Sequence, residues 1–205
     1  HCALRCIYCQ NHEISHGGHG TTYTEEGLAA LFLRLQAQGA ATLDLVTPTH
    51  YVPQILSALT AARAKGLTLP VVYNTSGYET PETIRLLAGA VDIYLPDLKY
   101  AAKESGRLYS GAPDYADAAR AAIISMAEQV GPVLFAPDGR LLRGVLIRHL
   151  ILPGHRRESI DLLRWIWNTF GNAVQLSLMR QYTPLYHAAQ HPPLHRRLTT
   201  FEYES

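Results

Sequence analysis

Five short apolar runs recur along the chain, and a helical pattern lies between each neighbouring pair. The runs cover residues 42–47, 70–75, 91–96, 144–152 and 173–178. They are rich in Val, Ile, Leu and Tyr, and they have the length of buried parallel strands. Strands that alternate with helices lie parallel, because each crossover returns the chain to the same end of the sheet. The sequence therefore predicts an α/β fold with one parallel sheet and its helices outside it.

The helices are predicted from apolar spacing and from their end signals. Apolar residues recur with helical spacing over 28–35, 52–59, 84–87, 115–122 and 163–170. Thr24 is a typical N-cap for the first helix, and Thr80, followed by Pro and Glu, is one for the third. The last of these helices is expected to bury Leu163, Ile166, Trp167 and Phe170. Asp138-Gly139 predicts a hairpin turn before the fourth strand.

Composition narrows the possible partners. The chain has 205 residues, of which 47% are hydrophobic and 17% charged, enough for one domain with a sizeable core. A formal net charge of +1 offers no basic excess for a nucleic acid or a membrane surface. No apolar run approaches the roughly 20 residues that cross a bilayer. Three clustered cysteines do not suit a secreted disulfide framework, so we expect a cytoplasmic protein with reduced thiols.

All three cysteines lie within the first nine residues, as Cys2, Cys6 and Cys9. The C-x3-C-x2-C spacing lets three sulfurs face one centre, whereas cysteines that only fill the core would be scattered. Two kinds of metal centre fit this pattern. One is a zinc site with His12 or His16 as the fourth ligand. The other is a [4Fe–4S] cluster on three thiolates, which leaves one iron open for a substrate or cofactor.

The cysteine segment resembles the signature of radical S-adenosylmethionine (SAM) enzymes, which have an aromatic residue before the last cysteine, here Tyr8. Its continuation, "CQNHEIS", is similar to that of the pyruvate formate-lyase activating enzyme and its relatives. Segments 73–79, 92–100, 146–154 and 177–184 are similar to segments of an activating-enzyme-related subgroup. The resemblance covers nearly the whole chain.

The resemblance implies a partial (β/α)6 barrel of the TIM type. Its first strand would run directly into the cysteine loop, so that strand is expected before His1. The chain also stops where a helix is expected to begin, with Thr199 or Thr200 as its cap and Glu202 in its first turn. Residues 1–205 are therefore expected to form a single radical SAM core domain, truncated at both ends.

The resemblance also implies the chemistry. A [4Fe–4S] cluster on the three cysteines would bind the amino and carboxylate groups of SAM at its open iron. After reduction it would pass one electron to the sulfonium, break the C5′–S bond and release a 5′-deoxyadenosyl radical that abstracts hydrogen. The expected substrate is a glycyl-radical enzyme and the expected electron donor a flavodoxin or ferredoxin. A small-molecule substrate is the close alternative, and a zinc-stabilised, non-catalytic binding domain is the competing class.

Three of the implied SAM contacts lie outside the central strands. Tyr8 would stack on the adenine, as an aromatic ring does on a base. Gln181, after the final strand, would reach the adenine or the substrate. Family members commonly have Gly-Gly-Glu-Pro after the strand that corresponds to 42–47, but this sequence reads "VTPTHYVPQ" there. Thr49 is the residue in that segment expected to accept a hydrogen bond from the SAM amino group, and His50 is as well explained by a structural role.

The remaining implied contacts lie on the central strands. Asn74 and Ser76 would approach the ribose and carboxylate of SAM. Asp97 would face the barrel mouth, where related enzymes use an Asp to bind a monovalent cation. Asn74 replaces the second acid of that site, which leaves cation binding open. Arg148 and His149 alternate on one strand, so only one of them faces the interior. Arg148 is expected to do so and to bind the SAM carboxylate.

Overall fold

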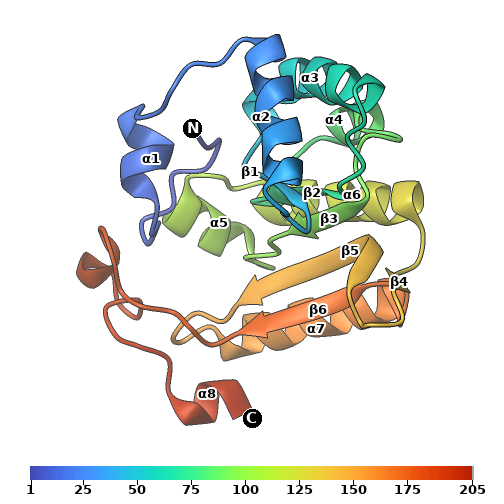
Figure 1. The fold of residues 1–205 in the computed structure, drawn as a ribbon. Helices are drawn as coiled ribbons and strands as arrows, with labels where there is room; N and C mark the ends of the chain where they lie inside the picture. Colours follow the sequence, from blue (N-terminus) through green and yellow to red (C-terminus); the bar gives the residue numbers. More distant parts are fainter. Residues whose placement is uncertain (205) are drawn as a thin grey trace.

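The computed structural model describes residues 1–204, and its centre is a mostly parallel sheet (Figure 1). The parallel strands are β1 (Leu43–Val46), β2 (Val71–Thr75), β3 (Ile93–Pro96), β5 (Leu141–Leu150) and β6 (Gln175–Met179). All of the predicted strands are thus confirmed. Each pairs with the next one along the chain, without the reversal of order that marks a doubly wound sheet. The sheet does not close within the described residues, and its strand order is compatible with a partial barrel.

The predicted hairpin is also present. Strand β4 (Leu134–Phe135) pairs antiparallel with β5 through Leu134↔Arg143 and Phe135↔Leu141. The turn between them contains Gly139, whose φ is +85° and whose amide donates to the carbonyl of Ala136. A glycine adopts this left-handed conformation without steric cost, which is why Asp-Gly favours such a turn.

Helices surround the sheet, and several begin where the sequence indicates. They are α1 (His12–Gly17), α2 (Glu25–Ala37), α3 (Val52–Ala64), α4 (Pro81–Leu86), α5 (Lys103–Ser110), α6 (Tyr115–Val130), α7 (Arg156–Phe170) and α8 (Thr200–Glu204). The Thr24 hydroxyl accepts from the Gly27 amide at 3.1 Å, and the Thr80 hydroxyl accepts from the Thr83 amide at 3.2 Å. Thr199 caps α8 in the same way. Within residues 1–204 no helix has the length and apolar character to cross a bilayer.

The cysteine loop packs on the main core of the protein. Leu4, Cys6 and Tyr8 are buried and belong to the same apolar cluster as the central strands. The amides of Arg5 and Ile7 donate to the carbonyls of Ser110 and Tyr109, at 3.0 and 2.9 Å, at the end of α5. These two backbone hydrogen bonds fix the loop beside the carboxyl ends of the strands.

Helix α7 buries a different face from the predicted one. Its buried residues are Ser159, Leu162 and Ile166, whereas Trp167 is 63% exposed. The hydroxyl of Ser159 lies 2.8 Å from Nε2 of His149 on β5, and this buried hydrogen bond lies on the same face as Leu162 and Ile166. Of the residues predicted to be buried, only Ile166 lies fully in the core.

Helices α1 and α5 have no counterpart in the predictions. Helix α1 covers part of a segment rich in Gly and His, and it has no buried residue. Helix α5 buries Ser105, Gly106, Tyr109 and Ser110, so its inner face consists largely of small residues. At Gly106 a Cβ would collide with the carbonyl oxygen of Ala112. Close backbone packing, rather than apolar spacing, therefore holds α5 in place.

Replacement of Gly77 tests the contact between β2 and β3 that supports the strand ends. Gly77 has a φ of +80°, and an added Cβ would collide with the carbonyl oxygen of Asp97. Gly89 is the matched control, since its φ is +73° with nothing within 4 Å of an added Cβ. We expect Gly77→Ala to lower the free energy of unfolding by more than about 3 kcal/mol and Gly89→Ala by only about 1 kcal/mol. Urea unfolding followed by circular dichroism measures both, and equal losses would contradict the backbone collision.

Candidate functional site

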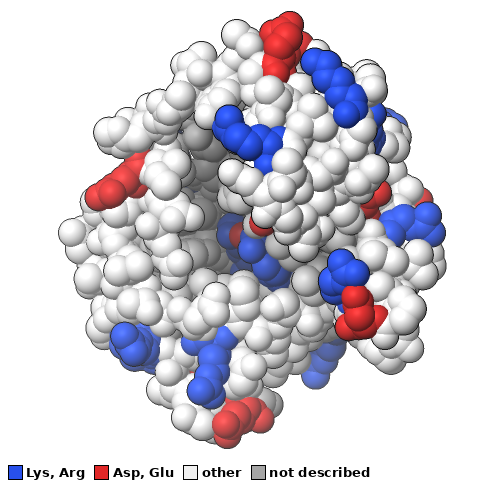
Figure 2. Space-filling view, viewed as in Figure 1, with Lys and Arg blue, Asp and Glu red and all other residues white. Residues whose placement is uncertain are grey.

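One cavity of about 350 Å³ lies where the cysteine loop meets the carboxyl ends of the parallel strands. Figure 2 shows the hollow, with Lys or Arg and acidic side chains visible inside it. Every strand except β4 contributes to the lining, directly or through the residues that follow it. In a parallel sheet the carboxyl ends of all strands lie at one edge, which is where ligand sites form.

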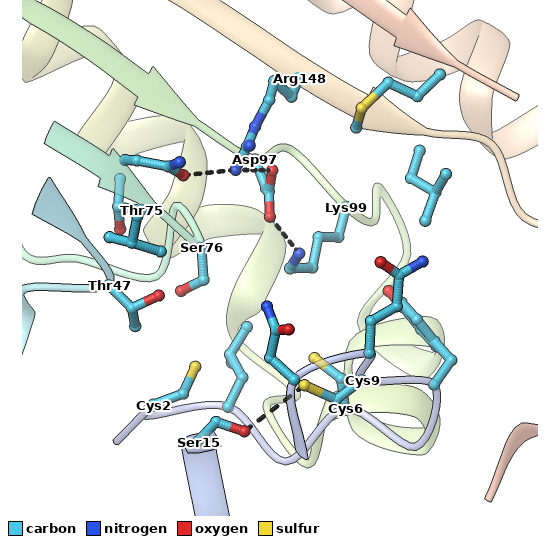
Figure 3. Close-up of a pocket in the computed structure, with 18 of the residues that line it drawn as sticks. Cys2, Cys6, Cys9, Ser15, Thr47, Thr75, Ser76, Asp97, Lys99 and Arg148 are labelled. Carbon is cyan, nitrogen blue, oxygen red and sulfur yellow. Dashed lines mark hydrogen bonds and ion pairs between the residues drawn. The ribbon is translucent and has the colours of Figure 1, made fainter. Parts of the chain in front are cut away.

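The three cysteines all line this cavity, and Figure 3 shows them on one side of it. All three are free thiols; Cys6 is buried, whereas Cys2 and Cys9 are partly exposed. The Cys6 sulfur lies 2.9 Å from the Ser110 hydroxyl, and the Cys9 sulfur lies 3.6 Å from that of Ser15. Burial raises the pKa of the Cys6 thiol, although the Lys99 charge and the Ser110 hydrogen bond act in the opposite direction. The loop thus presents three potential thiolate ligands to one space.

Opposite the cysteines, two cations share one carboxylate (Figure 3). Asp97 accepts from Arg148 at 2.8 Å through one oxygen and from Lys99 at 2.5 Å through the other. Arg148 also donates to the amide oxygen of Asn74 at 2.7 Å. Burial lowers the pKa of the Lys99 ammonium group, but Asp97, Cys6 and Tyr115 together outweigh burial and raise this pKa above its ordinary value. One carboxylate against two cations leaves the cluster with a positive charge, suited to an anionic ligand group.

Arg148 has one nitrogen, the buried Nε, without a hydrogen-bond partner among the described residues. The Arg148 side chain as a whole lines the cavity and is 27% exposed, so a carboxylate could form a charge-assisted hydrogen bond with the guanidinium group. The residues present therefore fit a ligand that carries a carboxylate.

Strand β5 separates its two basic side chains as predicted. Arg148 faces the cavity, whereas His149 is buried on the opposite face of the strand. Nδ1 of His149 lies 2.6 Å from the Leu98 carbonyl and Nε2 lies 2.8 Å from the Ser159 hydroxyl. Burial lowers the pKa of His149, so the ring is held neutral between one acceptor and one hydroxyl. His149 has a structural position between β5 and α7.

Most of the residues singled out from the sequence meet in the cavity. Besides the cysteines, these are Tyr8, Asn74, Ser76, Asp97, Arg148 and Gln181. Their roles toward SAM stay predictions. The lining also includes Thr47 and Lys99, which the sequence did not single out as ligand contacts. Their only sequence signal is that each lies within two residues of a predicted site position.

Thr49 is not among the residues that line the cavity. Its hydroxyl donates to Glu79 at 2.6 Å, and the hydroxyl of Thr75 donates to the same oxygen at 2.6 Å. Burial raises the pKa of Glu79, whose second oxygen has no hydrogen-bond partner in the described part of the chain. Thr47, two residues earlier, lines the cavity instead, with a φ of +51°. A threonine was expected to line the cavity at position 49, but the threonine that lines it is Thr47.

Tyr8 lies at the cavity wall with its hydroxyl already engaged. Its oxygen is 2.6 Å from that of Tyr100, and its ring meets Tyr182 edge to face at 5.9 Å between centroids. These contacts hold the ring in one orientation beside the cysteine loop. Gln181 lies next to Tyr182 in the lining, with its side chain exposed.

Each of the two histidines expected to complete a zinc site bonds a backbone carbonyl through one ring nitrogen. Nδ1 of His12 lies 3.2 Å from the Cys9 carbonyl, and its ring stacks on Tyr186 with centroids 4.3 Å apart. Nε2 of His16 lies 3.3 Å from the Leu4 carbonyl. Over residues 1–204 no three His, Cys, Asp or Glu side chains are grouped as ligands of a single ion. A [4Fe–4S] cluster binds its cysteines through separate iron atoms, so the sulfurs need not meet at one point.

Replacement of His12 distinguishes between a zinc site and an iron–sulfur cluster at the cysteine segment. We expect His12→Ala to keep the full iron and sulfide content after anaerobic reconstitution, because the imidazole is not a cluster ligand. Cys9→Ala, in contact with the same histidine, should lose most of both. Loss of the stack on Tyr186 is expected to cost only about 1 kcal/mol of stability. Loss of metal from His12→Ala with zinc bound in the parent protein would contradict the iron–sulfur assignment.

Removal of the shared carboxylate tests the charged cluster. We expect Asp97→Asn to lower the free energy of unfolding by about 1–2 kcal/mol, because Lys99 and Arg148 lose their common anion in a half-buried site. Glu82→Gln is the matched control, since Glu82 pairs with Arg85 where both side chains are at least 65% exposed. That change is expected to have little effect on the free energy of unfolding, because water and salt screen an exposed ion pair. Equal losses in urea unfolding would contradict a special role for Asp97.

Comparison with known proteins agrees with the cavity and its cysteine loop. A sequence model of the radical SAM superfamily matches residues 1–166. An uncharacterised protein of Methanocaldococcus jannaschii is 29% identical over 213 residues. That match covers 99% of this chain but 57% of the relative, so the chain spans little more than half of the relative's length.

Solved structures with 14% sequence identity share the fold. SuiB of Streptococcus suis, bound to the precursor peptide SuiA, has a TM-score of 0.60 over 87% of this chain and 36% of its own. HydG, a maturase of the [FeFe]-hydrogenase, has a TM-score of 0.62 over 100% of this chain and 45% of its own. The enzyme anSMEcpe with bound AdoMet has a TM-score of 0.57 over 89% and 50%. The family match over most of the chain shows that it belongs to the radical SAM superfamily, whose cofactors are a [4Fe–4S] cluster and SAM.

Proposed function

We propose that this chain is the catalytic core of a radical SAM enzyme that abstracts hydrogen from a glycine of a protein substrate, as activating enzymes of glycyl-radical enzymes do. The observation that carries the radical SAM chemistry is the meeting, in one cavity, of three free cysteines and a positive Asp97–Lys99–Arg148 cluster. Thiolates suit iron, and a surplus of positive charge suits the carboxylate of SAM.

The residues that would hold the two cofactors lie on separate walls of the cavity. Cys2, Cys6 and Cys9 would hold the cluster, and Arg148 would bind the SAM carboxylate. When bound, the cluster and SAM together supply a 5′-deoxyadenosyl radical that can remove a hydrogen atom from carbon. Asp97 keeps Arg148 and Lys99 in place by holding one with each oxygen.

Other side chains of the lining would orient and shield the ligand. The hydroxyls of Thr47 and Ser76 lie at the ends of β1 and β2, where they can accept from an ammonium or bond a ribose hydroxyl. Leu150 and Met179 contribute apolar surface from β5 and β6. Apolar walls around a reactive radical exclude water and side reactions.

The case for a protein substrate rests on two observations. The sheet is not closed within the described residues, so a glycine-bearing loop has a side through which to enter. One structural relative, SuiB, has been solved with a precursor peptide bound. The chain contains no fourth cysteine for a second cluster, which favours simple hydrogen abstraction.

We further propose that a flavodoxin or ferredoxin donates the electron. We also propose that the protein is cytoplasmic, where its thiols stay reduced.

Product formation tests the radical chemistry. We expect full-length protein, reconstituted anaerobically and reduced in the presence of SAM, to form 5′-deoxyadenosine that is detectable by chromatography. Cys2→Ala, Cys6→Ala and Cys9→Ala should each reduce it to background, because each removes one cluster ligand. His12→Ala is the control that should retain it. A protein with a complete, reducible cluster that forms no 5′-deoxyadenosine would contradict the enzymatic proposal.

Isotope transfer tests the substrate. With a glycyl-radical enzyme deuterated at its glycines, we expect deuterium in the 5′-deoxyadenosine and a protein-based radical in the EPR spectrum. The same protein with the acceptor glycine changed to Ala is the control. Deuterium transfer only from small molecules would reject the protein substrate while keeping the radical SAM chemistry.

A further inference from the structure

A chain of buried hydroxyl groups connects the Cys6 sulfur to the wall of the cavity. The Cys6 sulfur lies 2.9 Å from the Ser110 oxygen, which lies 2.7 Å from the Tyr100 oxygen, which lies 2.6 Å from the Tyr8 oxygen. All four residues are at most 9% exposed. The sequence separations are 104, 10 and 92 residues, so the fold rather than the local chain brings these groups together.

A Cys6 thiolate bound to a cluster would fix the direction of every hydrogen bond in this chain. A thiolate has no hydrogen to donate, so the Ser110 hydroxyl must donate to the sulfur. Ser110 has one hydroxyl hydrogen, so Tyr100 must donate to the Ser110 oxygen. By the same argument Tyr8 must donate to the Tyr100 oxygen. The three hydroxyls thus point the same way, toward the ligand sulfur.

An aligned hydrogen-bond chain in a dry environment has a definite electrostatic effect. Each donor polarises the next, so the hydrogen bond to the sulfur is stronger than that of an isolated serine. A hydrogen bond to a ligand sulfur stabilises the cluster more when it has gained an electron, because the sulfur is then more negative. The chain therefore favours the reduced cluster.

We propose that Ser110, oriented by Tyr100 and Tyr8, donates a hydrogen bond to the Cys6 thiolate and raises the reduction potential of the cluster that this thiolate holds. The inference rests on the proposed function, because it needs the cluster. Ser110 and Tyr100 are positioning residues here, since they act on the cluster through Cys6. The Cys9 sulfur has a looser contact, with Ser15 at 3.6 Å in a partly buried position. The Cys6 sulfur thus has a shorter and more deeply buried hydrogen bond than the Cys9 sulfur.

Electrochemical titration of the full-length, reconstituted protein tests the proposal. The fraction of reduced cluster is measured by EPR as a function of applied potential. We expect Ser110→Ala to shift the reduction equilibrium about tenfold toward the oxidised cluster, which is a potential lower by about 59 mV for one electron. Tyr100→Phe, which keeps Ser110 but removes its polarising donor, should shift it in the same direction by a smaller factor.

Tyr109→Phe is the matched control. Tyr109 is the neighbour of Ser110 on α5 and is buried like Tyr100, but its hydroxyl bonds to His155 at 2.9 Å instead of to the chain. We expect this variant to keep the parent potential although it loses a buried hydrogen bond. Resonance Raman spectra in H2O and D2O give a second measurement. The Fe–S(Cys) frequency of the parent should change on exchange, and that of Ser110→Ala should change less.

Two results would overturn the proposal. One is an unchanged potential in Ser110→Ala or, if that variant fails to fold, in Tyr100→Phe, with a complete cluster. The other is an equal shift in Tyr100→Phe and Tyr109→Phe, which would point to general loss of packing. Failure of the proposed function is seen separately, as the absence of 5′-deoxyadenosine from the parent protein at any cluster potential.

Discussion

The ion pair between Asp97 and Arg148 joins the two halves of the sheet where the site lies. Asp97 follows β3 and Arg148 lies on β5, and the chain between them includes two helices and a hairpin. Their backbones form a parallel bridge, and the Leu98 amide donates to the Arg148 carbonyl at 2.8 Å. Backbone pairing therefore places the two charged side chains next to each other. Lys99 and Asn74 then attach to this pair, so three strands share one charged cluster.

Continuous apolar runs made the sheet predictable. Strands β2 and β3 are almost entirely buried and so have little polar alternation, which makes their sequences distinctive. Strands β1 and β6 are less buried, although the same kind of apolar run predicted them. The caps at Thr24 and Thr80 were predictable because one hydroxyl satisfies an otherwise free amide. The cysteine loop was predictable from spacing alone. The strand order that favours a partial barrel over a doubly wound sheet was predicted only from the family resemblance, because periodicity is the same in both.

The features that could not be predicted depend on contacts between distant residues. Helix α5 lacks an apolar stripe because Gly106 and Ser110 allow close approach, so its sequence resembles a polar loop. The face of α7 that is buried includes Ser159, which bonds to His149 on a distant strand. Thr49 was predicted at the cavity because it lies at the right distance after a strand. The sequence does not show that Glu79, from the next loop, binds that hydroxyl.

The backbone of Thr47 has a conformation that is unfavourable for a β-branched residue. A β-branched residue at a φ of +51° is strained, by about 1–3 kcal/mol, whereas glycine would adopt the same backbone freely. The Thr47 amide donates to the Asn74 carbonyl at 2.7 Å, so the turn itself needs no side chain at this point. Threonine is thus unfavourable for this turn, and its side chain lines the cavity. The strain at Thr47 therefore places a cost in folding free energy at one edge of the site.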